Sequence, residues 1–261
     1  MKPGRSENEK IDQGSRIQDK GFVLPSSGQG CWKKDNFPGA LCGSRYDRGS
    51  GSLTCHCLLS QLFSVHPTHP QARLLAQAAD ILTRGGLVAL PTDTTYALVC
   101  HLGDRTACDK LRRLRRLSEQ HYLTLLCADL SVLGQYAKVD NGSFRLLKHY
   151  TPGPYTFILP ATRDVPRRLV HAKRKTLGLR VPDHVLVQAL LQQMGEPLLS
   201  STLRLPDDDL PLTDADEIRS RLQKQVDLVI ESGSVGVQAT TVVDLTGPLP
   251  EVLRQGVGDF A

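Results

Sequence analysis

A short apolar run that is followed at once by small polar residues is the feature that most constrains the fold of this chain. Leu87–Leu90 is too short for an isolated helix and too continuous for a half-exposed strand, so it predicts a strand that is buried on both faces. Pro91 lacks an amide hydrogen and is expected to end the strand, and the polar segment Thr92–Thr95 follows directly. Open α/β sheets bind their ligands just past the ends of such strands. Taken alone, the stretch is more simply explained as a strand followed by a plain polar turn.

Composition narrows the class of protein. No apolar run approaches the ~18 to 20 residues of a membrane helix, so no membrane partner is expected. The net charge of +5 is too modest to indicate a nucleic-acid ligand by itself. Seven cysteines, none in a Cys-x-x-Cys pair, predict reduced thiols and a cytoplasmic location. Cys55–Cys57 has no second ligand pair at a usable spacing, so no dedicated metal site is expected.

The chain divides by composition into a leader and one domain. Residues 1–60 are polar and show no sustained apolar period, which predicts a disordered leader that cannot bury enough surface to offset its ordering entropy. Strand and helix patterns then alternate over residues 65–259 without repeats. This alternation predicts a single α/β domain with a twisted, mixed sheet.

Four helices can be placed from their periodicity and caps. An apolar stripe before Gly85 predicts one helix, and Gly85 is expected to end it. Another helix is predicted over about residues 184–194, with Gly195 as its C-terminal stop. Thr213 and Asp216 resemble a capping box for a helix over 214–224. The remaining helix carries an apolar stripe of Ala107, Leu111, Leu114 and Leu117, with four arginines, Arg112, Arg113, Arg115 and Arg116, on its other faces. Clustered arginines repel one another unless an anion or acidic neighbours compensate, so an anion-binding role is favoured over a solvated face.

Five motifs together resemble those of the YrdC/YciO family. Pro91–Leu98 is similar to its Pro-Thr-Asp/Glu-Thr-x-Tyr-Gly-Leu motif, and Pro152–Thr156 to its Pro-Gly-Pro-x-Thr turn. Leu179–Pro182 matches its Arg-x-Pro strand end. Thr240–Asp244 resembles its Ser-Thr-Val-Val-Asp segment, and Leu253–Gly256 its terminal Leu-Arg-x-Gly. The resemblance extends over nearly all of residues 65–259.

The resemblance carries definite expectations for fold and chemistry. It implies a YrdC-like α/β fold, in which a twisted mixed sheet flanked by helices surrounds a basic cleft for ATP, L-threonine and bicarbonate. The family includes threonylcarbamoyl-AMP synthases of tRNA modification, and members have been linked to double-stranded RNA. In the synthase reaction a threonine carbamate attacks the α-phosphorus of ATP and expels pyrophosphate. Mg²⁺ would arrive with ATP as the substrate rather than occupy a protein site.

The resemblance also implies which residues bind ligand. Hydroxyl groups at Thr94 and Thr156 would hold L-threonine or the nucleotide, and the guanidinium groups of Arg180 and Arg254 would pair with carboxylate or phosphate. Further ligand contacts are implied at Arg115, His121, Thr202, Arg204 and Thr240. Each arginine is equally compatible with a structural salt bridge, and His121 with a solvated loop position. No catalytic residue can be assigned.

Two departures from the synthases place the chain closest to the YciO branch. The synthases carry Lys-x-Arg after the threonine loop, where this chain has Arg115–Leu117; a shift to Arg113–Arg115 restores the second arginine but worsens the spacing to the next strand. Their Ser-x-Asn becomes Thr202–Arg204. Three functions remain compatible with these residues: a synthase with altered ATP contacts, a paralogue with another chemistry in the same cleft, and a non-enzymatic protein that binds nucleotide, tRNA or double-stranded RNA.

Overall fold

The computed structural model of this protein describes residues 60–118, 121, 123–166, 169–170 and 174–261. Every element described below belongs to one unit of the chain, His56–Ala261. The predicted leader lies outside the described residues up to residue 59, as does the motif Cys55–Cys57. Most of the basic loop between residues 167 and 173 lies outside them as well.

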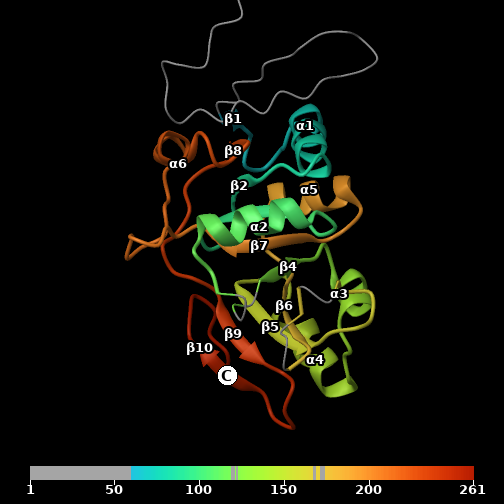
Figure 1. The fold of residues 1–261 in the computed structure, drawn as a ribbon. Coiled ribbons are helices and arrows are strands. Elements are labelled where there is room, and N and C mark those ends of the chain that lie inside the picture. Colours follow the sequence, from blue (N-terminus) through green and yellow to red (C-terminus); the bar gives the residue numbers. More distant parts are fainter. Residues whose placement is uncertain (1–59, 119–120, 122, 167–168, 171–173) are drawn as a thin grey trace, which may run out of the picture. The chain divides into compact units, whose positions relative to one another are not determined.

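The described residues form ten strands and six helices (Figure 1). The strands are β1 (Gln61–Ser64), β2 (Val88–Pro91), β3 (Tyr96–His101), β4 (Thr124–Leu126), β5 (Tyr155–Pro160), β6 (Thr176–Arg180), β7 (Leu198–Thr202), β8 (Leu228–Glu231), β9 (Thr241–Asp244) and β10 (Glu251–Arg254). The helices are α1 (Ala72–Thr83), α2 (Arg105–Leu114), α3 (Leu130–Tyr136), α4 (Asn141–Tyr150), α5 (Val185–Met194) and α6 (Ala215–Leu222).

All ten strands join one mixed sheet in the order β1-β8-β2-β3-β7-β4-β6-β5-β9-β10. Four neighbouring pairs are parallel: β1 with β8, β8 with β2, β4 with β6 and β5 with β9. The other five pairs are antiparallel. The predicted α/β class with a mixed sheet is therefore confirmed.

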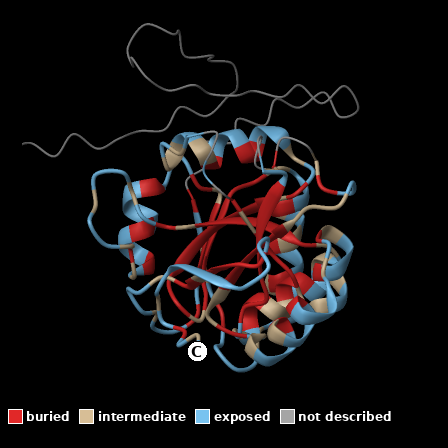
Figure 2. Cartoon of the chain, turned by 90° about the horizontal axis from the view of Figure 1, so that it is seen from below, coloured by how far each residue is buried: buried red, intermediate tan, exposed pale blue. Residues whose placement is uncertain are grey.

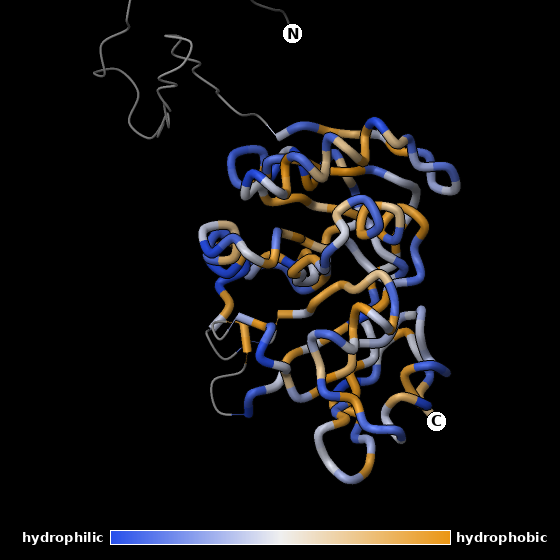
Figure 3. Tube along the Cα trace, turned by 90° about the vertical axis from the view of Figure 1, so that its right-hand side faces the viewer, coloured by the Kyte–Doolittle hydropathy of each residue, from blue (hydrophilic) through white to orange (hydrophobic). Residues whose placement is uncertain are grey.

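Two hydrophobic cores lie on opposite faces of the sheet. On one face, α1 and α5 pack over β2, β3, β7 and β8 and form the smaller core, which includes Leu82, Val99 and Leu190. On the other face, α2, α3, α4 and α6 build the larger core, which includes Tyr96 and Phe157. The strands are buried between the helices in Figure 2, and the hydrophobic segments of the trace alternate with hydrophilic ones in Figure 3. The predicted buried run, Leu87–Leu90, is fully buried.

Several predicted elements differ in detail from those observed. Pro91 is the last residue of β2, as predicted, but it pairs with Tyr96 at the start of β3, a strand that the sequence did not predict. The sheet also includes β1, which lies ahead of the predicted domain start at residue 65. The predicted cap at Thr213 is wrong, because the carboxylate of Asp214 accepts the hydrogen bond from the Glu217 amide, 2.7 Å away. Gly85 and Gly195 do follow helices, both with positive φ as predicted for helix ends.

The described cysteines are poor nucleophiles. Cys100, Cys108 and Cys127 are buried, and burial raises the pKa of the Cys127 thiol to about 12. Among the described residues, no cluster of three metal-binding side chains occurs. None of the helices that the structure describes is long and apolar enough to cross a membrane.

Candidate functional site

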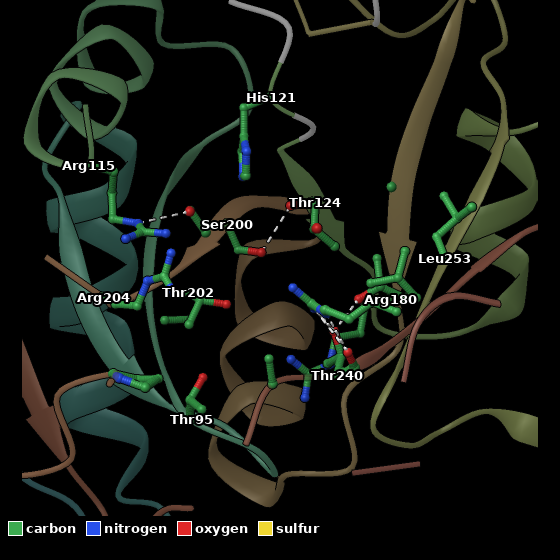
Figure 4. A pocket seen from close by; sticks show the side chains of 18 of the residues that line it. Thr95, Arg115, His121, Thr124, Arg180, Ser200, Thr202, Arg204, Thr240 and Leu253 are labelled. Carbon is green, nitrogen blue, oxygen red and sulfur yellow. Dashed lines mark hydrogen bonds between the residues drawn. The ribbon is translucent and has the colours of Figure 1, made fainter. Parts of the chain in front are cut away.

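A cavity of about 530 Å³ opens over the middle of the sheet (Figure 4). Its floor is made by alternate residues along β5, β6, β7 and β9, together with Thr240 directly before β9, because successive side chains of a strand point to opposite faces. These floor residues are Thr156 and Ile158, Gly178 and Arg180, Ser200 and Thr202, and Thr240 and Val242. Leu198 on β7 shares this face and packs in the smaller core, so α1 and α5 cover one part of the face and the cavity occupies another.

Eight of the nine predicted site residues line this cavity. They are Arg115, His121, Thr156, Arg180, Thr202, Arg204, Thr240 and Arg254. The ninth, Thr94, is buried and accepts a hydrogen bond from the guanidinium of Arg180 at 3.1 Å instead of lining the cavity. Its neighbour Thr95 lines the cavity in its place. The fold therefore brings together residues that are up to 139 positions apart, from Arg115 to Arg254.

Three guanidinium groups reach the cavity from separate elements. Arg115 follows α2, Arg204 follows β7 and Arg254 ends β10. Arg115 approaches the Ser201 hydroxyl at 3.4 Å, and Arg254 donates to the carbonyl of Thr240 at 2.9 Å. Among the described residues, no carboxylate oxygen lies within 4.0 Å of a side-chain nitrogen of these three arginines. Their positive charges are therefore uncompensated within the described part of the chain.

The three arginines also repel one another. Burial and then the charge of Arg204 lower the pKa of Arg115 to about 10. The same two causes, in the same order, lower the pKa of Arg254. An arginine with a pKa near 10 still carries its charge at neutral pH. Such a cavity is suited to an anion with several charged oxygens, which would relieve the repulsion and satisfy the free donors.

Arg180 differs from these three because its charge is compensated within the protein. Its side chain is 8% exposed and forms an ion pair with the carboxylate of Asp93, which is 11% exposed. Burial lowers the pKa of Arg180, while Asp93 opposes this shift. The Nε atom of Arg180 and the Oδ2 atom of Asp93 make no further hydrogen bond within the described residues. Arg180 therefore lines the cavity and also forms the structural salt bridge that the sequence left open, with Asp93 of the threonine loop.

Of the four arginines in the predicted run, only Arg115 lines the cavity. Helix α2 ends at Leu114, and a positive φ of 48° at Arg116 redirects the chain, so only Arg115 points into the cavity. Arg116 pairs with Asp207 at 3.3 Å on the surface. Arg112 donates to the Ser118 carbonyl at 2.9 Å. The alternative alignment at Arg113–Arg115 gains no support, because Arg113 donates to the carbonyl of Asp109 on its own helix.

Hydroxyl groups line much of the remaining wall. Thr156 and Thr240 contact each other through their hydroxyl oxygens at 2.9 Å. Ser200 donates to the Thr124 carbonyl at 3.0 Å, and both residues line the cavity. Sequence reasoning missed Thr124, Ser200 and Ser201. The sequence signal that could have indicated the two serines was the run of consecutive hydroxyl residues in β7, Leu198–Thr202, which is a buried strand.

His121 lies at the rim with its ring directed into the cavity (Figure 4). Partial burial of the ring, followed by the charges of Arg115, Arg112 and Arg254, lowers the pKa of His121. The imidazole is therefore neutral at neutral pH. It is placed to gain a proton when an anion screens the neighbouring arginines.

The side chains that line the cavity are suited to binding and positioning a ligand rather than to nucleophilic attack on it. Among the described residues that line it, there is no cysteine, and Asp209 is the single carboxylate. In the described lining, hydroxyl groups hydrogen-bond to one another, to backbone carbonyls or to arginine, and none of these bonds joins a hydroxyl to His121 or Asp209. Chemistry at such a site depends on orienting reactants and compensating their charge.

Comparison with known proteins identifies the family of this chain. The sequence profile of the Sua5/YciO/YrdC family, described as telomere recombination, matches residues 80–256. The chain belongs to this family. It is 51% identical to the uncharacterised protein YciO of Escherichia coli over 201 residues, which cover 77% of this chain and 98% of YciO. The crystal structure of E. coli YciO covers the same shares of the two chains, with a TM-score of 0.75.

More distant members of the Sua5/YciO/YrdC family have named ligands or activities. The threonylcarbamoyl-AMP synthase of Bacillus subtilis is 29% identical over 184 residues, which cover 70% of this chain and 53% of the synthase. The structure of Sua5 from P. abyssi, solved in complex with L-threonine, is 25% identical with a TM-score of 0.70, and the match covers 76% of this chain and 58% of Sua5. This Sua5/YciO/YrdC protein is thus similar to YciO over most of its length and to the synthases over one part of theirs.

Proposed function

We propose that this protein binds ATP and L-threonine in the cavity and acts as a threonylcarbamoyl-AMP synthase-like protein. The observation that carries the proposal is the convergence of Arg115, Arg204 and Arg254 on one hydroxyl-lined cavity without carboxylate partners among the described residues. A triphosphate supplies the several anionic oxygens that three guanidinium groups require. The hydroxyl pair of Thr156 and Thr240 would receive L-threonine beside it.

The proposed reaction needs positioning more than a reactive side chain. The amine of threonine combines with bicarbonate to form a carbamate, with loss of water. A carbamate oxygen then attacks the α-phosphorus of ATP, and the bond from that phosphorus to the β-phosphate oxygen breaks to release pyrophosphate. Arginines from three elements would hold the charge that shifts onto the leaving pyrophosphate. Mg²⁺ would enter with ATP and keep most of its water ligands, because it binds substrate phosphates more often than dedicated protein cages.

Calorimetric titration of ATP tests the binding step. Arg254→Ala removes one uncompensated guanidinium, and a hydrogen bond to a charged group contributes roughly 1.5 to 3 kcal/mol, so ATP affinity should fall by about tenfold or more. Arg116→Ala is the matched control. Its guanidinium is exposed and paired with Asp207 outside the cavity, so the affinity should not change. Identical titrations for wild type and Arg254→Ala would contradict the proposal.

A second candidate function is nucleotide binding without adenylate synthesis. It is favoured by Leu117, which packs against the larger core and supplies no donor to the cavity at a position where the synthases carry arginine. Incubation with ATP, L-threonine and bicarbonate separates the two candidates. Release of pyrophosphate that depends on L-threonine supports the synthase, whereas ATP binding without pyrophosphate release supports the second candidate.

A further inference from the structure

The segment 255–261 runs behind the wall of the cavity. Thr156 on β5 and Thr240, directly before β9, face the cavity, so their neighbours Tyr155 and Thr241 face the other side of the sheet. Those two neighbours contact the segment 255–261. Tyr155 donates from its hydroxyl to the carbonyl of Asp259 at 2.8 Å, and its ring packs near Phe260. Each anchor of the segment is thus adjacent in sequence to a residue that lines the cavity.

Thr241 is the centre of these contacts. It is fully buried, and its hydroxyl donates to the carbonyl of Gly258 at 2.5 Å while it accepts from the amide of Gly256 at 2.9 Å. The Val257 amide, between the two glycines, donates to the carbonyl of Ala239 at 3.0 Å. One hydroxyl therefore closes a loop of backbone against the residues that precede β9.

The two glycines allow this close approach. A Cβ atom at Gly256 would lie 2.2 Å from the carbonyl oxygen of Ala239, and one at Gly258 would lie 2.4 Å from the ring of Tyr155. Neither distance is sterically tolerable, and the first involves backbone that cannot move aside easily. Ala239 and Thr240 line the cavity, so the segment sits directly against the backbone of the cavity wall.

The position of Arg254 depends on the segment 255–261, because its own strand, β10, holds it only weakly. All four residues of β10 are exposed, the strand pairs with β9 alone, and its register shifts between Val252 and Arg254. Arg254 is followed at once by Gln255, whose amide donates to the Gly258 carbonyl at 2.7 Å. The guanidinium meanwhile donates to the carbonyl and the hydroxyl of Thr240, at 2.9 and 3.2 Å.

We propose that Thr241 is a positioning residue, which holds the segment 255–258 against the cavity wall and thereby fixes the guanidinium of Arg254 over the ligand. Thr241 itself does not touch the cavity. Its effect on a ligand passes through Arg254. The effect on ATP rests on the proposed function, whereas the effect on the order of the segment does not.

A double-mutant cycle with Arg254 separates positioning from a general structural role. Thr241→Val removes both hydrogen bonds at nearly constant shape and should lower ATP affinity by up to about tenfold, no more than Arg254→Ala does. Thr241→Ser keeps the hydroxyl and should restore the affinity. In the double variant Thr241→Val/Arg254→Ala, the affinity should equal that of Arg254→Ala alone, because both changes disable the same contact. Fully additive losses would overturn the proposal.

Hydrogen exchange of the ligand-free protein tests the same role without ATP. Thr241→Val should speed amide exchange in residues 251–258, while α1 and β2 keep wild-type protection. Thr162→Val is the matched control, since it removes a hydroxyl-to-carbonyl hydrogen bond of 2.8 Å to Gln135 away from the segment. Gln255→Ala is a milder second variant, because its side chain is exposed, and it should act in the same direction. Unchanged exchange in residues 251–258 would overturn the proposal, whereas failure of ATP to bind wild type would overturn only the proposed function.

Discussion

At the scale of single residues, the buried ion pair of Asp93 and Arg180 is the contact with the largest expected effect on stability. Removing one member leaves an uncompensated charge in the interior, which typically costs about 3–5 kcal/mol. Arg180→Met should therefore lower the free energy of unfolding by an amount in this range, measured by urea denaturation. The pair is nearly inaccessible to water, so screening by salt should change this loss little.

The matched double variant distinguishes the pair from simple loss of packing. In Asp93→Asn/Arg180→Met neither charge remains, so most of the lost stability should return. If the double variant is as unstable as the sum of the two single variants, the loss comes from packing and not from an uncompensated charge.

His121 should couple ligand binding to proton uptake. Partial burial and the charges of Arg115, Arg112 and Arg254 hold its pKa below 6.5 in the free protein. A bound polyanion cancels part of that positive charge and raises the pKa. The bound state then holds more protons than the free state between the two pKa values, so affinity should rise as the pH falls through that window.

Calorimetry in two buffers of different ionisation enthalpy measures the protons taken up. ATP also changes its own protonation, and His121→Asn supplies the background for that contribution. The wild type should take up more protons than the variant in the same buffers. Equal uptake by the two proteins would show that His121 does not respond to the ligand.

At the scale of elements, the sequence and the structure assign the N-cap of α6 to different residues. The sequence favoured Thr213 as the cap, whereas the Asp214 carboxylate accepts from the Glu217 amide. Loss of an N-cap typically costs about 0.5–2 kcal/mol. Asp214→Ala should lower the free energy of unfolding by about that amount, and Thr213→Ala should lower it much less. The reverse order in chemical denaturation would restore the capping box that the sequence predicted.

The elements that the sequence predicted well are those with a strong local signal. Leu87–Leu90 is an uninterrupted apolar run that only a doubly buried strand accommodates, and Gly195 ends α5 with a positive φ of 69°. Strand β1 was missed because Gln61–Ser64 is a short edge strand that is partly exposed. Strand β3 was missed because it follows the threonine loop directly, where the hydroxyl residues dominate the local pattern.

The candidate site could be predicted as a set of residues but not as a set of contacts. Motif positions indicated eight of the residues that line the cavity. The partner of Arg180 lies 87 positions away in Asp93, and no spacing rule connects two loops that meet only through the sheet. The same limit hid the turn at Arg116, because a positive φ in a residue other than glycine is set by tertiary contacts.

At the scale of the whole molecule, the described unit should be stable and active without the residues before it. The described sheet begins with β1 at Gln61, and the cavity lining begins at Thr95. Deletion of residues 1–59 should leave the melting temperature within a few degrees and the ATP affinity unchanged. A large fall in the melting temperature, measured by calorimetry, would show that the deleted residues stabilise the domain.

The position of β7 in the sheet has a consequence for how the protein is made. This strand joins β3 to β4, although both are synthesised long before Leu198–Thr202 leaves the ribosome. Until then the nascent chain carries two separate parts of the sheet, β2 with β3 and β4 with β6 and β5. Each part exposes an unpaired strand edge, which can pair with other chains. Arg115 lies beside one part and Arg180 in the other. The nascent protein should therefore need protection from chaperones during translation, and it should acquire its ligand site only after β7 has joined the two parts and β9 and β10 have been added.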